Sequence, residues 1–324
     1  MKILWLYSYI PHRHYIHWFH TDFAKIVGQQ KGIELKMYGF KLDQVKDLKK
    51  LLLQHYNPNI TMKDLKNKFD FDIIIMDCHN RMFKHSSPSR NCWLPKDFNE
   101  FNETPKVLIE GDYHNIEKPN KLSKMGIDLI LHRHISNKIK ASKTLSNIKN
   151  LWLPCSVDNT IFKPNPNIER KEIVYVIGAY KHLAYIYRKK IIEILQKENL
   201  IKISKNTKRD QEYVNSLQNY VSCLNGSSKY NITSAKMFEI MASGSVLLTD
   251  ESNDYGLQDL FYKGSYCTYK RDGSDIIKKA KKIISDIDYR NQIIKKAIKC
   301  IQERHTHVIR AKELCQILKK EFNL

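Results

Sequence analysis

Short apolar runs alternate with longer amphipathic stretches along the first half of the chain. Five runs are nearly continuous in apolar residues and are interpreted as buried strands: 2–10, 33–40, 71–78, 106–112 and 127–133. Residues 15–32 and 44–55 instead place apolar residues at helical spacing. Continuous apolar strands are typical of a sheet that is covered on both faces. Their alternation with helices predicts βαβ units and a parallel sheet.

The same alternation starts again after residue 171. The segment 150–171 contains three prolines and several turn-forming residues, so we place the domain junction there, and 172–180 is expected to be a new first strand. Further strands are expected at 200–204 and 245–250, and helices at 187–198, 210–220, 234–242, 274–284, 287–303 and 307–321. The pattern predicts an α/β protein with two doubly wound, Rossmann-like parallel-sheet domains. Their expected limits are 1–153 and 154–306, and a final helix at 307–324 returns to the first domain.

Composition supports two folded domains. The chain has 324 residues, of which 42% are hydrophobic and 27% are charged, enough to build two cores. It contains no apolar run of about 18 residues, so no membrane span is expected. The opening "MKILWLYSYIPHRH" lacks a small-residue cleavage site and is interpreted as a strand, not a signal peptide. The seven scattered cysteines include no CxxC pair, which favours reduced thiols and a cytoplasmic location, in the host cell if the protein is viral.

The net charge of +21 raises the question of a polyanionic partner. Residues 1–150 hold 25 basic and 15 acidic residues, and residues 151–324 hold 30 and 19, so the excess is spread evenly. It is carried by 44 lysines against 11 arginines, whereas direct readers of nucleic acid favour arginine. DNA therefore stays an open partner.

Histidines follow four of the expected strands in the first domain. Ligands of open parallel sheets bind at the carboxyl ends of strands, where these residues are expected to converge. The residues concerned, strand by strand, are His12 and His14; Asp77 and His79; Glu110, Asp112 and His114; and His132 and His134. The alternative is that histidine is simply common in loops. His17 and His20 lie within the following helix and are interpreted as bystanders.

A metal site is the competing interpretation of these histidines. Two or three histidines with a carboxylate suit zinc, iron or manganese. The sequence has no HExxH motif, however, and the first-domain loops are not otherwise rich in acidic residues. We therefore expect no metal ligands.

The segment 229–261 contains the most specific pattern. Thr233 or Ser234 is expected to cap a helix that Gly244 ends. The N-terminus of such a helix suits a diphosphate, to which Lys236 in the first turn adds a charge. Glu239 lies three residues further on nearly the same face and suits a ribose diol. An ordinary amphipathic helix that buries its apolar residues explains the same pattern, and both interpretations can hold together.

This segment resembles GT-B glycosyltransferases, specifically the family-4-like and spore-maturation CgeB-like group. The resemblance rests on "SAKMFEIMASGSVLLTD", on "GLQDLF" and the helices after it, on "HTHVIR", and on the linker "WLPCSVDNTIFKP". It covers most of residues 150–315, and the first domain is similar only in layout. It implies two domains facing across a cleft, with the acceptor on the first and the nucleotide sugar on the second.

The resemblance also implies roles for individual residues. Lys236 would bind the donor diphosphate with Thr233 and Ser234 at the helix start, and Glu239 would bind ribose or sugar hydroxyls. The turn from Gly178 to Lys181 would approach the phosphates. Arg188 would line the cleft, and His305, Thr306 and Arg310 would form a structural closing motif. One departure is Asn231, which stands where retaining members carry a second glutamate.

The expected function is transfer of a sugar from a nucleotide-diphosphate sugar, UDP-glucose type favoured, to a hydroxyl, with retention. No tightly bound cofactor is expected. His114 and Asp112 are the first candidates for the catalytic base, and His12 and His14 the second, in an acceptor-side wall with His79 and His132. The acceptor is expected to be a hydroxylated base in viral DNA or, alternatively, a protein, a surface glycan or a small molecule. Two competing hypotheses are a non-catalytic binding protein and a histidine-rich metalloenzyme.

Overall fold

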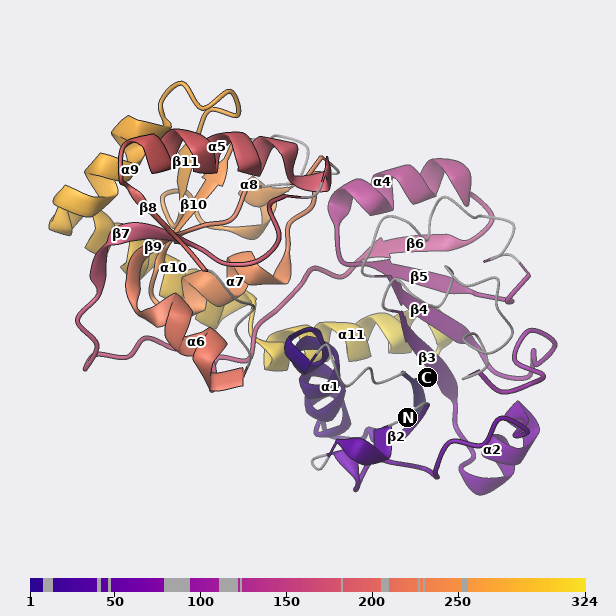
Figure 1. The fold of residues 1–324 in the computed structure, drawn as a ribbon. Helices are drawn as coiled ribbons and strands as arrows, with labels where there is room; N and C mark the ends of the chain where they lie inside the picture. Colours follow the sequence, from indigo (N-terminus) through magenta and orange to yellow (C-terminus); the bar gives the residue numbers. More distant parts are fainter. Residues whose placement is uncertain are drawn as a thin grey trace. The chain divides into compact units, whose positions relative to one another are not determined.

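The chain folds into two compact units (Figure 1). The computed structural model describes residues 1–7, 14–39, 42–45, 48–78, 94–110, 122, 124–181, 183–204, 210–226, 228–229, 231–251 and 256–324. Unit 1 comprises Met1–Pro154 together with Arg310–Leu324, and unit 2 comprises Cys155–Ile309. The first unit is therefore built from both ends of the chain, and the second from one continuous stretch.

Unit 1 contains a parallel sheet of six strands in the order β2-β1-β3-β4-β5-β6. The strands are β1 (Lys2–Leu6), β2 (Glu34–Tyr38), β3 (Ile73–Cys78), β4 (Lys106–Glu110), β5 (Leu129–His132) and β6 (Lys149–Trp152). The helical segments that belong wholly or mainly to this unit are α1 (His14–Gly28), η2 (Leu42–Gln44), α2 (Met62–Lys68), α4 (Ile135–Thr144) and α11 (His307–Phe322).

Apolar side chains cover both faces of this sheet, because successive residues of a strand point to opposite sides. Leu4 and Leu6 of β1 join a core with α2 and α4. Ile3 and Trp5 of the same strand join a second core with α1 and α11. Helix α11 contributes four buried residues to that second core: Ala311, Leu314, Cys315 and Leu318. The continuous apolar strands seen in the sequence are thus explained by burial on two sides.

Unit 2 contains a parallel sheet of five strands in the order β11-β10-β9-β7-β8. The strands are β7 (Lys171–Val176), β8 (Ile201–Ile203), β9 (Tyr220–Leu224), β10 (Val246–Asp250) and β11 (Cys267–Tyr269). The helices are η5 (Leu183–Tyr185), α5 (Ile186–Lys197), α6 (Asp210–Gln218), α7 (Ala235–Ala242), α8 (Leu257–Leu260), α9 (Ile276–Ser285) and α10 (Ile287–Arg304).

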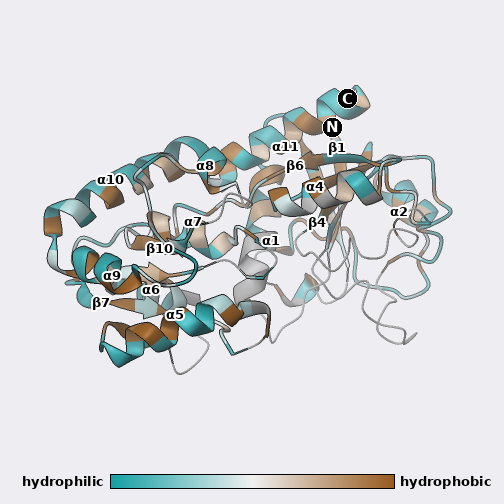
Figure 2. Cartoon of the chain, turned by 90° about the horizontal axis from the view of Figure 1, so that it is seen from above, coloured by the Kyte–Doolittle hydropathy of each residue, from teal (hydrophilic) through white to brown (hydrophobic). Residues whose placement is uncertain are grey.

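Helices cover both faces of the second sheet as well. Helices α5 and α9 pack together on one face, α6 and α7 on the other, and α10 contacts both α9 and α7 (Figure 1). Helix α5 is amphipathic and carries both hydrophobic and hydrophilic residues (Figure 2). Ile191, Ile192 and Leu195 are buried, while Lys189 and Lys190 are exposed. Two doubly wound parallel sheets confirm the fold class that the sequence predicts.

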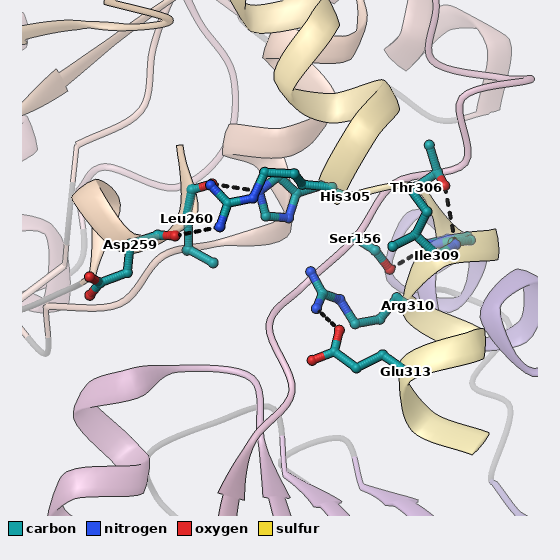
Figure 3. Close-up of polar contacts among 10 residues, drawn as sticks. Ser156, Asp259, Leu260, His305, Thr306, Ile309, Arg310 and Glu313 are labelled. Atoms are coloured by element: carbon teal, nitrogen blue, oxygen red, sulfur yellow. Dashed lines mark hydrogen bonds and ion pairs between the residues drawn. The ribbon is translucent and has the colours of Figure 1, made fainter. Parts of the chain in front are cut away.

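The segment before α11 closes unit 2 (Figure 3). His305 is buried and donates from Nε2 to the Leu260 carbonyl at 2.7 Å. Its ring lies edge-on to Phe238 of α7, with centroids 5.2 Å apart. Beside it, Val157 exchanges backbone hydrogen bonds with His305 and His307 at 3.0 and 2.9 Å. The first residues of unit 2 are thereby paired with its last ones.

One predicted helix is wrong. Residues 44–55 were expected to be helical, but in the described part of this segment η2 ends at Gln44 and turns follow. The backbones of Leu51 and Leu53 instead bond to Met37 of β2 at 2.7 and 2.9 Å. The edge strand offers unpaired backbone groups, and satisfying them outweighs the local helical pattern of charges and leucines.

Candidate active site

The sheet of unit 2 has a topological switch point between β7 and β9. Strand β8 lies on one side of β7, and the later strands follow on the other side. The connections after β7 and β9 therefore leave in opposite directions, and ligands of doubly wound sheets bind at the carboxyl ends of the strands at such a point. Gly178 follows β7 there, and Asn225 and Gly226 follow β9.

Helix α7 brings Lys236 to this switch point. The Lys236 ammonium donates a hydrogen bond of 2.7 Å to the Ile177 carbonyl, just beyond β7. Gly178 has a φ of +103°, and a Cβ atom there would lie 2.5 Å from the Lys236 Nζ. Only glycine combines this backbone angle with the close approach of the ammonium.

Ser234 is the N-cap of α7, but its side chain does not cap the helix. Its hydroxyl instead accepts a hydrogen bond of 2.7 Å from the Asn225 amide. The first turn of a helix presents N–H groups and the positive end of the helix dipole. Such a terminus binds anions, and here it ends beside Lys236.

Arg188 of α5 places a second cation at the same strand ends. Its guanidinium is buried and donates to the Asn225 side chain at 3.0 Å and to the carbonyls of Gly226 and Ala179 at 2.7 and 3.1 Å. Asn225 thus joins Arg188 to Ser234, and through Ser234 to the start of α7. One hydrogen-bonded network therefore joins the residues directly after β7 to those directly after β9.

The electrostatics of the site favour an anion. The pKa of Lys236 is lowered to about 8, first by burial and then by the charge of Arg188, while Glu239 partly opposes the shift. Two cations that disfavour each other's charge are stabilised by a negative group between them. The site therefore suits a phosphate or diphosphate.

Glu239 lies one turn further along α7, where Tyr213 of α6 donates a hydrogen bond to its Oε2 atom. Burial raises the pKa of Glu239, while the Tyr213 hydroxyl and Lys236 act to lower it. Burial and the neighbouring Glu239 charge raise the pKa of Tyr213 well above its ordinary value. Tyr213 therefore stays protonated and acts as a donor.

A second polar group lies at the end of β10. Asp250 is buried and bonds to Arg271 at 3.2 Å, and Arg271 also donates to the Asn231 side chain. Asn231 has a φ of +53°, a left-handed conformation that asparagine tolerates better than glutamate. The residue type at this departure from the family pattern thus fits both the backbone and the arginine beside it.

The sequence-predicted donor residues are therefore placed as follows. Gly178, Arg188, Ser234 and Lys236 lie around the switch point, and Glu239 follows on the same helix. Thr233 is buried directly before the N-cap, and Lys181 is exposed after the Gly178 turn. Gly244, with a φ of +74°, ends α7 as expected.

The sequence interpretation missed three residues of this site: Tyr213, Asn225 and Gly226. Strand β9 was not predicted, so the residues at its end were not considered. The signal was present in "YVSCLNG", a short apolar run followed by the turn-forming Asn-Gly pair. Tyr213 gave no local signal, because its partner lies 26 residues away.

The first-unit candidates are only partly described. Asp112 and His114, within 111–121, and His12, within 8–13, lie outside the described residues, as does His79. His14 is the first residue of α1, and only its backbone is described. These candidates stay predictions.

His132 does not belong to an acceptor-side wall, and that interpretation is wrong. Its side chain is fully buried, with Nδ1 3.2 Å from Glu110 Oε2 and Nε2 2.8 Å from Asn150 Oδ1. The Asn150 amide nitrogen donates to two backbone carbonyls, so its oxygen faces His132 and accepts from Nε2. The buried His132 side chain therefore connects Glu110 of β4 to Asn150 of β6.

Within the described ranges, no group of three or more histidine, cysteine or acidic residues could hold a metal ion. Among the helices that the structure describes, none is long and apolar enough to cross a membrane.

Comparisons with known proteins agree with this architecture. Residues 173–316 match the sequence model of a family described as glycosyl transferase-like. No curated protein matches the chain. The matched residues comprise most of unit 2 and the first part of α11.

Three solved structures share the fold over the whole chain. Sucrose-phosphate synthase from Thermosynechococcus elongatus is 11% identical, with a TM-score of 0.65 and 99% coverage of both chains. A glycosyltransferase from Rickettsia africae is 12% identical, with a TM-score of 0.64 and coverage of 99% of this chain and 98% of that one. HepE from Anabaena, solved in complex with UDP-glucose, is 11% identical, with a TM-score of 0.64 and coverage of 99% and 100%. The chain has the two-unit fold of GT-B glycosyltransferases.

Proposed function

We propose that this chain is a glycosyltransferase that transfers a hexose from a nucleotide-diphosphate sugar to a hydroxyl acceptor, with retention. The observation that carries the proposal is the pair of cations, Lys236 and Arg188, held at the switch point beside the start of α7. The family match of residues 173–316 supports it. A UDP-glucose-type donor is favoured because HepE, which shares the fold, was solved with UDP and with UDP-glucose. We also propose that the chain belongs to the CgeB-like subgroup.

The donor diphosphate binds at the first turn of α7 in this proposal. Lys236 and the N–H groups after Ser234 contact its oxygens, and Thr233 supports the turn. The segment Gly178–Lys181 approaches from the end of β7, while Arg188 fixes that loop through the Ala179 carbonyl. Glu239 accepts hydrogen bonds from the ribose or sugar hydroxyls.

Catalysis then relies on charge that is already in place. As the bond between sugar and diphosphate breaks, negative charge grows on the leaving diphosphate, and Lys236 and the helix terminus stabilise it. This stabilisation requires no metal ion. For the base that assists the acceptor hydroxyl, the predicted residues are His114 and Asp112, then His12 and His14.

The acceptor is the least constrained part of the proposal. A net charge of +21 favours a polyanion, and a hydroxylated base in DNA combines that charge with a hydroxyl group. A protein, a surface glycan or a small molecule are the other acceptors. Four cysteines of the described part are free thiols, which supports action in the reducing cytoplasm: Cys223, Cys267, Cys300 and Cys315.

Release of UDP from UDP-glucose tests the activity. We expect slow release by the wild-type protein, acceleration by a true acceptor, and a loss of about 100-fold or more in Lys236→Ala. Lys189→Ala is the matched control, since this exposed lysine lies on the outer face of α5. The proposal is contradicted if none of the UDP-, GDP-, ADP- and dTDP-sugars releases its nucleoside diphosphate with any of the four acceptor classes.

A non-catalytic sugar-nucleotide or nucleic-acid binding protein is the second candidate, and Asn231 favours it. Retaining relatives resemble this chain but carry glutamate at that position, whereas Asn231 here binds Arg271. Binding of UDP-glucose without release of UDP under any acceptor condition distinguishes this candidate from the enzyme.

A further inference from the structure

We propose that Tyr213 is a positioning residue that aims the Glu239 carboxylate at the ribose diol of a bound nucleotide. The inference rests on the proposed function and deepens it. Tyr213 lies outside the segment 229–261 and would help the site to distinguish a ribose from a deoxyribose.

The packing around the Tyr213 ring holds its contact with Glu239 in place. Tyr213 lies on α6, is 8% exposed, and donates its hydroxyl to Glu239 Oε2 on the neighbouring α7. Phe162 packs edge-on against the Tyr213 ring, with centroids 6.1 Å apart. A buried ring that is packed in this way has little freedom to move, so it holds one carboxylate oxygen in a single place.

The other oxygen of Glu239 is left for a ligand. Among the residues that the structure describes, Tyr213 is the one that hydrogen-bonds to the Glu239 carboxylate, through Oε2, and Glu239 is only partly buried. Glu239 lies three residues after Lys236, about 4.5 Å further along the helix axis and on nearly the same face. A nucleotide whose phosphate meets Lys236 therefore has its sugar next to Glu239.

The hydroxyl of Tyr213 also favours the charged form of this carboxylate. Burial raises the pKa of Glu239, and the two groups that oppose the shift are Tyr213 from α6 and Lys236 from its own helix. Cys223 of β9 and Tyr175 of β7 lie close enough to act on Tyr213 itself. An ionised carboxylate accepts hydrogen bonds from both hydroxyls of a diol, whereas a protonated carboxyl group is a weaker acceptor.

The test compares UDP with 2′-deoxy-UDP on wild type and Tyr213→Phe by titration calorimetry from pH 5 to 8. We expect wild type to prefer UDP. Tyr213→Phe should bind UDP about 3–10-fold more weakly, because the hydrogen bond that orients the Glu239 carboxylate is lost. Its affinity for 2′-deoxy-UDP should be almost unchanged. The loss of UDP affinity at low pH should also begin at a higher pH. Tyr289→Phe is the matched control, because this partly buried tyrosine of the same unit also loses a hydroxyl donor, here to Cys267 Sγ at 3.7 Å.

Glu239→Gln keeps the proposal testable if Tyr213→Phe folds poorly. This variant should lose the preference for UDP and the pH dependence, and adding Tyr213→Phe should change neither further. An unchanged UDP preference and pH profile in Tyr213→Phe overturns the inference. An equal loss of affinity for both nucleotides overturns it as well. In either case, UDP binding by the wild-type protein leaves the proposed function intact. Wild type that binds none of UDP, GDP, ADP and dTDP overturns the proposed function and the inference with it.

Discussion

The charge of Lys236 depends on whether an anion is bound beside it. With no anion bound, burial and Arg188 lower its pKa to about 8, so the group loses its proton only slightly above neutral pH. A diphosphate beside it favours the charged form. The protein therefore prefers the protonated lysine more strongly when the site is filled than when it is empty.

This coupling predicts that UDP affinity falls as pH rises. Below about pH 8 the free site already carries the ammonium, so binding is strong. Above it, binding must also take up a proton, and affinity should drop towards 10-fold for each further pH unit. Titrations at pH 7 and 9 measure the effect, and Lys236→Met should bind weakly with no such dependence. A wild-type affinity that is equal at both pH values contradicts the assignment.

Gly178 offers a second test at the residue scale. Gly178→Ala places a methyl group 2.5 Å from the Lys236 Nζ on a backbone with a φ of +103°. We expect a loss of about 1–3 kcal/mol in unfolding free energy and clearly weaker UDP binding, because the ammonium is displaced.

Gly32→Ala separates the two effects. Gly32 has a φ of +76°, but a Cβ atom there meets nothing within 4 Å. It should show a similar loss of stability with UDP affinity unchanged. Equal UDP affinity in both alanine variants means that the Gly178 contact does not matter for binding.

Local chemistry decided which site residues the sequence could predict. Ser234, Lys236 and Gly244 lie in one short segment, where a cap, a first-turn cation and a helix-ending glycine form a readable pattern. Asn225 and Tyr213 act through partners 9 and 26 residues away. Their roles depend on how β9 and α6 lie beside α7, which no local pattern contains.

At the scale of elements, α7 is held in place by the closing segment, the residues from His305 to the start of α11. Phe238 on its buried side contacts both Phe261 and His305, and His305 is fixed by the Leu260 carbonyl. The closing segment therefore supports the helix that carries Lys236, although it lies about 70 residues later in the chain.

His305→Ala should destabilise unit 2 by about 2–4 kcal/mol, because it leaves a cavity against Phe238 and a buried carbonyl without its donor. Chemical denaturation measures this loss, and UDP titration should show weaker binding. His55→Ala is the control, since that side chain is 82% exposed, and should change stability by less than about 0.5 kcal/mol. Stability equal to wild type in His305→Ala removes the proposed support of α7.

The elements themselves were predictable where burial on two faces made the strands apolar. That pattern identified β1, β3, β4 and β10 directly. It failed for the helix expected at 44–55, whose charged amphipathic pattern is typical of a helix but whose backbone pairs with β2. It also missed β6 and β9, because β6 lies in a stretch interpreted as a linker and β9 mixes serine and cysteine with its apolar residues.

At the scale of the whole molecule, the charge of +21 makes a prediction about the acceptor. If DNA is the partner, the logarithm of the binding constant should fall linearly with the logarithm of salt concentration, with a slope of about −0.9 for each phosphate contacted. We expect a slope steeper than about −3 for duplex DNA, measured by fluorescence anisotropy between 50 and 300 mM salt. UDP titrated over the same range controls for general salt effects. A slope near zero rules out an electrostatic DNA acceptor.

The position of α11 has a consequence for how the protein is made. This helix supplies Ala311, Leu314, Cys315 and Leu318 to a core whose other residues come from the first half of the chain. During translation the sheet of unit 1 therefore emerges with one face only partly covered and must wait until α11 has left the ribosome. Unit 2, encoded without interruption between these two parts, can fold first. The nascent chain thus exposes apolar surface for the time needed to translate more than 150 codons, and chaperone binding to unit 1 is expected during that interval.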